Sequence, residues 1–235
     1  MKPACLTAVL MSAALVMPAL VSAQAVDEDQ LGAWYMYFYD VRFEDSRFGL
    51  QGDGQWRNWD LGGDLEQLLL RSGATFTPED SNTTFTFGYA SITSGSFGPS
   101  DASQHEHRIY QEALIRQRVG SRVRLRHRLR TEQRFVEDQD FRTRFRYALF
   151  VDIPLNRREM NPGAYYLALY DEVFINLERN IGDGRRVDRV DRNRLYGALG
   201  YVVTSTLKVQ GGVMLQSSGS IDKPQLQLSL HQAFR

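Results

Sequence analysis

The sequence predicts an all-β fold, a closed antiparallel transmembrane β-barrel of about 10 to 12 strands that follows a cleaved signal peptide. Three observations predict it. The first residues have the layout of an export signal. After them no apolar stretch is long enough for a membrane helix, although 43% of the residues are hydrophobic. Finally, segments of roughly ten residues alternate apolar with polar side chains, as the strands of a membrane barrel do.

The export signal lies at the start of the chain. Lys2 gives it a positive charge, and residues 6–21 are apolar without a charged side chain. Small residues allow cleavage after Ala23 or after Ala25, and we prefer Ala23. A retained membrane anchor is the alternative. It needs about 20 apolar residues, whereas Pro18 interrupts a run that is already shorter.

Cysteine and charge content exclude several classes of function. The one cysteine, Cys5, falls in the expected signal peptide, so the mature chain has no thiol for catalysis, disulfides or metal ligation. Lys+Arg and Asp+Glu number 28 each, and removal of Lys2 leaves 27 against 28. Such a balance gives no bulk attraction to nucleic acid.

Residues 122–135 show the strand pattern most openly. One parity is mainly apolar, from Val123 and Leu125 to Leu129 and Phe135. The other parity is charged throughout: Arg122, Arg124, Arg126, Arg128, Arg130, Glu132 and Arg134. A helix would scatter these arginines around its circumference, whereas a strand places them on one face.

The next segment, 141–153, repeats the alternation. Its polar parity begins with three arginines: Arg142, Arg144 and Arg146. Two adjacent strands lined by arginine predict a charged interior. Segment 165–177 alternates too, except that Asp171 falls on the apolar parity. We expect a β-bulge near Asp171 that restores the register.

Eight further segments complete the expected barrel: 34–43, 50–59, 65–76, 83–92, 105–118, 191–203, 207–216 and 225–234. The total is about eleven, whereas single-chain bacterial barrels have an even number of strands and both termini on the periplasmic side. We therefore expect one miscounted strand within 34–76, where glycines blur the alternation. No linker divides the chain, which predicts a signal peptide over 1–23 and one barrel domain over 24–235.

The connections indicate which end of the barrel faces outward. Residues 93–104 and 180–189 are long and polar, and we expect them to be external loops. Residues 204–206 read as a periplasmic turn, and 154–163 is then the one long connection on the periplasmic side.

A secreted soluble β-sandwich or lipocalin-like barrel is an alternative, because such proteins also alternate and also follow a signal peptide. Their strands usually run about 5 to 6 residues, however, and 122–135 is long enough to cross a membrane. Seven consecutive charged positions on one inner face would also be very costly without water. Both observations favour the bacterial outer membrane.

Stretches distributed over the mature chain carry a family resemblance: 55–59 (QWRNW), 64–67 (DLEQ), 106–112 (EHRIYQE), 128–135 (RLRTEQRF), 166–172 (YLALYDE) and 193–196 (NRLY). Together they resemble a Gram-negative outer-membrane β-barrel family catalogued only as a domain of unknown function. The resemblance implies a barrel in the outer membrane, but no substrate, reaction or catalytic residue. The chain departs from the pattern at its end, where Arg235 follows the aromatic Phe234.

Charges on segments 105–118 and 122–135 predict a ladder across these two strands. A turn at 119–121 sets opposite charges face to face in three rungs: Glu112–Arg128, Arg108–Glu132 and Glu106–Arg134. A register shifted by two residues pairs Glu112 with Arg130 and leaves Glu132 opposite Tyr110. Charge complementarity therefore favours the first register.

This lumen charge ladder is the candidate site. Its members are Glu106, Arg108, Glu112, Arg124, Arg126, Arg128, Arg130, Glu132, Arg134, Arg142, Arg144 and Arg146. In a wet lumen each rung contributes about 0 to 1 kcal/mol. The ladder either fixes the register and fills the lumen or forms a cationic path for anions, and the commonness of solvated ion pairs favours the first.

A lipid-modifying enzyme of the acyl hydrolase type is the alternative function, because such barrels place a Ser/His pair on the outer wall. His127 is the one histidine expected where a lipid-directed base belongs, and no serine shares its strand face. His231 is expected in the lumen. His105 and His107 share a face, but we identify no further ligands that would make a metal site, and no cofactor.

The sequence therefore predicts an outer-membrane β-barrel, either structural or a narrow pore, with an Arg/Glu-lined lumen. Expected partners are outer-membrane lipid, the barrel-assembly machinery through the C-terminal strand, and a small anionic solute, but not nucleic acid. A soluble secreted binding protein is the second alternative function.

Overall fold

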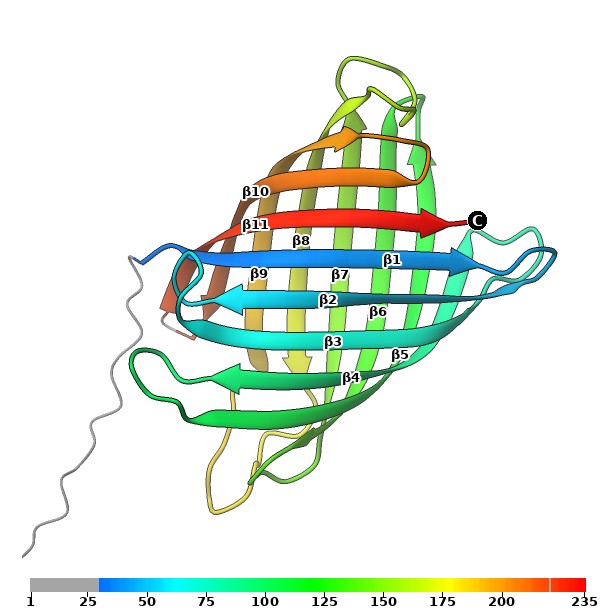
Figure 1. Cartoon of the computed structure of the whole chain (residues 1–235). Coiled ribbons are helices and arrows are strands. Elements are labelled where there is room, and N and C mark those ends of the chain that lie inside the picture. The colour runs from blue at the N-terminus through cyan, green and yellow to red at the C-terminus, as the bar shows by residue number, and fades with distance from the viewer. Residues whose placement is uncertain (1–29, 220) are drawn as a thin grey trace, which may run out of the picture.

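The computed structural model describes residues 30–219 and 221–235, so the expected signal peptide over 1–23 lies outside the described residues. Within them no helix is long and apolar enough to cross a membrane. The chain forms one closed barrel of eleven strands (Figure 1). In chain order these are β1 (Gly32–Arg42), β2 (Phe48–Asn58), β3 (Leu65–Phe76), β4 (Thr83–Gly95), β5 (Ser103–Val119), β6 (Val123–Val136), β7 (Arg142–Pro154), β8 (Tyr165–Asn176), β9 (Val190–Val202), β10 (Leu207–Ser218) and β11 (Ile221–Phe234).

The barrel closes through a parallel seam between β1 and β11. Both strands run in the same direction (Figure 1), from Gly32 opposite Gln225 to Val41 opposite Phe234. The other neighbouring strands pair antiparallel. The sequence count of eleven is therefore confirmed, and the expected miscount within 34–76 is wrong. The even-number rule assumes wholly antiparallel closure, and one parallel pair permits an odd count.

The seam places the beginning of β1 and the end of β11 at opposite ends of the barrel, which corrects the expectation that both termini share one end. The N-terminal end, where β1 begins, carries five connections: 59–64, 96–102, 137–141, 177–189 and the short link from β10 to β11. The C-terminal end, where β11 finishes, carries five: 43–47, 77–82, 120–122, 155–164 and 203–206. The two loops expected to be external thus share one end, and the two connections expected to be periplasmic share the other.

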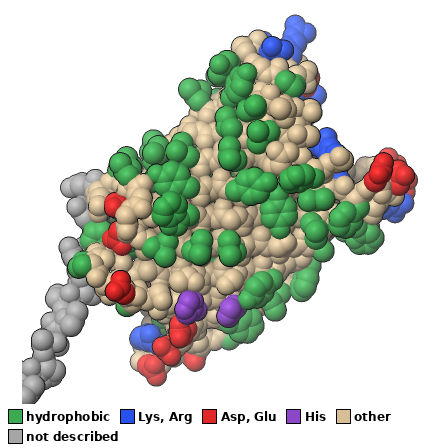
Figure 2. Space-filling model, viewed as in Figure 1, with side chains coloured by type: hydrophobic (Ala, Val, Ile, Leu, Met, Phe, Trp, Pro, Cys, Tyr) green, Lys and Arg blue, Asp and Glu red, His purple; other side chains and the backbone are tan. Residues whose placement is uncertain are grey.

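The strands alternate between an apolar outer wall and a polar lumen. Figure 2 shows apolar side chains spread over the wall, with charged side chains gathered toward its edges. Phe87 of β4 and Leu199 of β9 are 63% and 62% exposed on this wall. Three consecutive leucines in β3 keep the pattern. Leu69 is buried inside, and its neighbours Leu68 and Leu70 are exposed outside.

Asp171 lies on the outer wall without a change of register, so the expected bulge at this residue is wrong. β8 stays paired on both sides of it, opposite Leu149 and Leu195. The side-chain amide of Asn193 donates a hydrogen bond of 2.8 Å to its carboxylate. The irregularity of β8 lies instead between Phe174 and Ile175.

Glycines on the inner face make room for a lumenal tyrosine. A Cβ atom at Gly88 would lie 2.3 Å from Cζ of Tyr110, and one at Gly73 would lie 2.8 Å from its hydroxyl. Glycine is therefore required at these two positions for Tyr110 to lie flat against the wall. The guanidinium groups of Arg71 and Arg130 lie over the ring of Tyr110.

Candidate functional site: the charged lumen

β5 and β6 pair in the register that the sequence reasoning rejected. Val119 lies opposite Val123, and Gly120, with a φ of 59°, opens the turn 120–122. The turn therefore begins one residue later than expected. As a result Glu112 lies opposite Arg130 rather than opposite Arg128.

Diagonal contacts balance the like charges that this register brings together. Arg108 and Arg134 lie opposite each other across β5 and β6. Both donate to Glu106, Arg108 at 2.6 Å from its Nε and Arg134 at 2.5 Å. The sequence reasoning required each charge to pair with its direct neighbour, whereas an arginine side chain also reaches the diagonal position.

Glu132 is the centre of the buried network. Its side chain is only 2% exposed. It accepts hydrogen bonds from Arg144 at 3.0 and 2.7 Å and from Arg146 at 2.5 Å. Arg108 and Arg130 lie 3.9 and 3.7 Å from the same carboxylate. Four guanidinium groups thus share one buried negative charge.

Two more carboxylates extend the network over β5, β6, β7 and β8. Glu112 accepts from Arg130 at 2.7 Å. Glu172 accepts from Arg128 at 2.6 Å and from Arg146 at 2.9 Å. We call the side chains joined in this way, centred on Glu106, Glu112, Glu132 and Glu172, the Arg/Glu network.

Aromatic rings stabilise arginines that lack a carboxylate of their own. Trp34 has the guanidinium of Arg57 at 4.0 Å and that of Arg194 at 4.7 Å from its ring centre. Its indole nitrogen donates to Glu66 at 2.8 Å. Such cation–π contacts contribute about 2 kcal/mol or more where water is excluded. Tyr110 adds the same kind of contact, at 4.6 Å, to Arg130, which also binds Glu112.

Lumenal arginines become more exposed from the Arg/Glu network toward the C-terminal end. The side chains of Arg130 and Arg144 are 4% and 3% exposed, whereas those of Arg126 and Arg118, nearer the C-terminal end, are 35% and 49% exposed. A cavity of about 980 Å³ remains, lined both by arginines of the network and by basic residues nearer the C-terminal end. Eighteen arginine and lysine residues line it against six carboxylates, and three further lumenal carboxylates, Glu66, Glu132 and Asp191, lie outside this lining. The balanced charge of the whole chain therefore conceals a cationic lumen.

A loop closes over part of this opening. Arg118 and Arg124, which face each other across β5 and β6, both donate to Glu159 in the connection 155–164. The hydrogen bond from Arg118 lowers the pKa of Glu159. Sequence reasoning had no means to find this contact, because Glu159 lies on a connection that the strand pattern does not place.

The twelve candidate residues face the lumen. Nine are buried: Glu106, Arg108, Glu112, Arg130, Glu132, Arg134, Arg142, Arg144 and Arg146. Arg124, Arg126 and Arg128 are partly exposed there. Sequence reasoning missed Asp152 of β7 and the charged partners that other strands contribute: Asp53, Arg57, Glu66, Arg71, Glu172, Asp191 and Arg194. Each of these residues could have been found from the sequence by one signal, a charged side chain at a polar position of the alternating pattern in its strand.

His105 and His107 lie two residues apart on the outer face of β5, whereas His127 and His231 lie on opposite faces of the sheet. His127 lies on the outer wall, where its Nδ1 is 2.9 Å from the Tyr147 hydroxyl and its Nε2 is 3.3 Å from Gln117. His231 faces the lumen, with its Nε2 2.9 Å from Oγ of Ser229 and its ring stacked on Phe38. In the described part of the chain, no three His, Cys, Asp or Glu side chains could hold a metal ion.

The sequence that forms this barrel matches one known protein family. Residues 31–227 match the family described as "Protein of unknown function (DUF2490)". The chain belongs to this family. The match extends from β1 into β11 and so covers nearly the whole barrel. No curated protein and no solved structure matches the chain.

Proposed function

We propose that the protein is an outer-membrane β-barrel in which the Arg/Glu network closes the lumen, so that it serves as a structural barrel rather than an open pore. The distribution of side chains carries the proposal. Large apolar residues are exposed over the outer wall (Figure 2), and charged residues are buried inside. Soluble monomers rarely expose contiguous apolar patches beyond a few hundred Å², whereas lipid would cover such a wall.

Closure of the lumen is supported by side chains from both sides of the barrel. Glu132 and Arg144 fill it from β6 and β7. Gln225 and Gln227 of β11 are 0% and 1% exposed, and Trp34 of β1 is 2% exposed. A hydrated solute would have to displace these groups and their hydrogen bonds in order to pass.

The remaining expected partners follow from β11. Leu226, Leu228, Leu230 and Phe234 lie on one face of this strand, and we propose that they contact membrane lipid and take part in recognition by the barrel-assembly machinery. Leu228, Leu230 and Phe234 are 43%, 46% and 47% exposed. The seam partner β1 covers the backbone edge of β11 in the finished barrel.

Cell fractionation with a heat-modifiability gel tests the membrane location. We expect a band that is extracted only by detergent and that shifts on heating, because a closed sheet resists detergent until it is heated. Release of the protein into the soluble periplasm would contradict the location and favour a secreted binding protein.

Electrical recording in a planar lipid bilayer tests the closure. We expect no steady current through the wild-type barrel, and a steady anion-selective current would contradict a closed lumen. Acyl-ester hydrolysis that disappears in His127→Ala would instead favour the enzyme alternative.

A further inference from the structure

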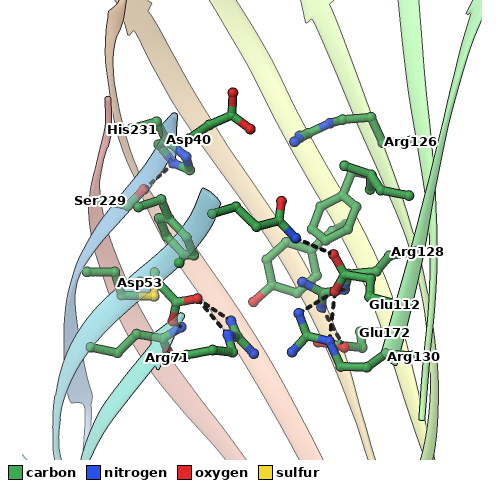
Figure 3. A pocket seen from close by; sticks show the side chains of 18 of the residues that line it. Asp40, Asp53, Arg71, Glu112, Arg126, Arg128, Arg130, Glu172, Ser229 and His231 are labelled. Carbon is green, nitrogen blue, oxygen red and sulfur yellow. Dashed lines mark hydrogen bonds and ion pairs between the residues drawn. The ribbon is translucent and has the colours of Figure 1, made fainter. Parts of the chain in front are cut away.

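The open part of the lumen has a composition of its own. We call the space at the C-terminal end the vestibule, and define it by Arg42, Arg116, Arg124, Arg126 and Lys208 with their facing carboxylates. Figure 3 shows Arg126 and Asp40 pointing into this space from opposite walls, beyond the ion pairs of Glu112 and Asp53. The basic residues come from β1, from the consecutive strands β5 and β6, and from β10.

Positive charge exceeds negative charge in the vestibule. With Arg118 it holds six basic side chains and three carboxylates: Asp40, Asp152 and Glu159. Each carboxylate is already engaged. Glu159 binds Arg118 and Arg124, Asp152 lies 3.1 Å from Arg126, and Asp40 lies 3.9 Å from Arg42.

Two of the basic side chains have no carboxylate partner in the described structure. Arg116 donates to the hydroxyl of Thr84 at 2.7 Å and makes no ion pair there, and neither does Lys208. Arg126 lies within electrostatic range of both, and the nearest carboxylates in that range, Asp40 for Arg116 and Asp152 for Lys208, are already engaged with Arg42 and Arg126. Like charges gathered between low-dielectric walls focus the potential and raise the local concentration of anions.

We propose that the vestibule binds a soluble anion with two or more phosphate groups. An excess of three positive charges spread over several strands matches a multivalent anion better than a single monovalent ion. Guanidinium groups hold phosphate oxygens through paired, charge-assisted hydrogen bonds, and an ammonium group adds a point charge. The closed sheet encloses the site, which favours a soluble phosphate over a headgroup anchored in the surrounding lipid. This inference does not depend on where the barrel is located.

Calorimetric titration of the purified, folded full chain in neutral detergent with inorganic pyrophosphate tests the proposal. We expect one pyrophosphate per barrel, weaker binding of orthophosphate, and an affinity that falls as salt is added. Arg116→Gln and Lys208→Gln should each weaken binding roughly tenfold or more, because each removes a charge-assisted contact. Arg47→Gln is the matched control. Arg47 lies at the same end of the barrel but forms an exposed ion pair with Glu79 outside the vestibule. Its replacement should therefore not change pyrophosphate binding.

Three results would overturn the proposal. They are absence of pyrophosphate binding by the folded wild type, an unchanged affinity in both vestibule variants, and an equal loss in Arg47→Gln.

Phosphatidylglycerol vesicles, with phosphatidylcholine vesicles as the blank, distinguish the source of the phosphate. Binding of these vesicles that depends on Arg116 while pyrophosphate fails to compete would replace the soluble anion by a lipid headgroup. The heat shift of each variant shows that it is folded before it is titrated.

Discussion

Removal of the charge of Glu132 should destabilise the barrel more than any single surface charge. Glu132→Gln keeps the shape of the side chain but removes the carboxylate to which Arg144 and Arg146 donate three hydrogen bonds, and leaves them only Asp191 and Glu172 as counter-charges. The side chain is 2% exposed, so water screens little of the loss. Removal of one partner from a buried ion pair typically costs about 3 to 5 kcal/mol, and we expect a decrease of that size in the free energy of unfolding.

Urea unfolding of the refolded barrel in detergent micelles, followed by tryptophan fluorescence, measures this change. Glu79→Gln is the control, because Glu79 is 71% exposed in its ion pair with Arg47 and should contribute less than about 1 kcal/mol. Adding Arg146→Gln to Glu132→Gln should recover part of the loss, since it removes a cation left without its main partner. If Glu132→Gln and Glu79→Gln cost the same, the network is solvated and the reasoning from burial is refuted.

Three further predictions concern register, closure and orientation. Cysteines placed at Glu112 and Arg130 should form a disulfide on mild oxidation, whereas a pair at Glu112 and Arg128 should not; the reverse result would restore the rejected register. Cysteines at Tyr37 and Leu230, which face each other across the seam, should also crosslink, and failure of this pair in a folded barrel would argue against parallel closure. An epitope inserted in 180–189 should be reachable by antibody on intact cells and one in 204–206 should not, with the opposite accessibility inverting the barrel.

The strands themselves could be predicted from the sequence, because alternation is a local property. In 122–135 each side chain is assigned to a face by its parity alone, and β6 spans Val123–Val136 as that pattern indicates. Parity also placed the arginines of β7 inside. Even the sequence count of eleven strands was right, and only the general rule of even numbers argued against it.

The register could not be predicted from pairwise charge matching. Arg108 and Arg134 face each other because Glu106, diagonal to Arg134, binds both of them. Glu172 of β8 neutralises Arg128 and Arg146 from strands earlier in the chain. A two-strand argument omits these third-strand carboxylates, so it chose the register in which every charge has its own opposite neighbour.

The sequence by itself determined the barrel, the faces of its strands and the charged character of its interior, because each follows from a period of two residues along a single strand. The tertiary structure decided the parallel seam, the sharing of each carboxylate among several arginines, and the division of the lumen into the Arg/Glu network and the vestibule. The physical reason is that these features depend on which distant strands meet across the closed sheet. A long arginine side chain binds whichever carboxylate the closed sheet brings within its reach. The position of the arginine in the sequence therefore does not predict its partner.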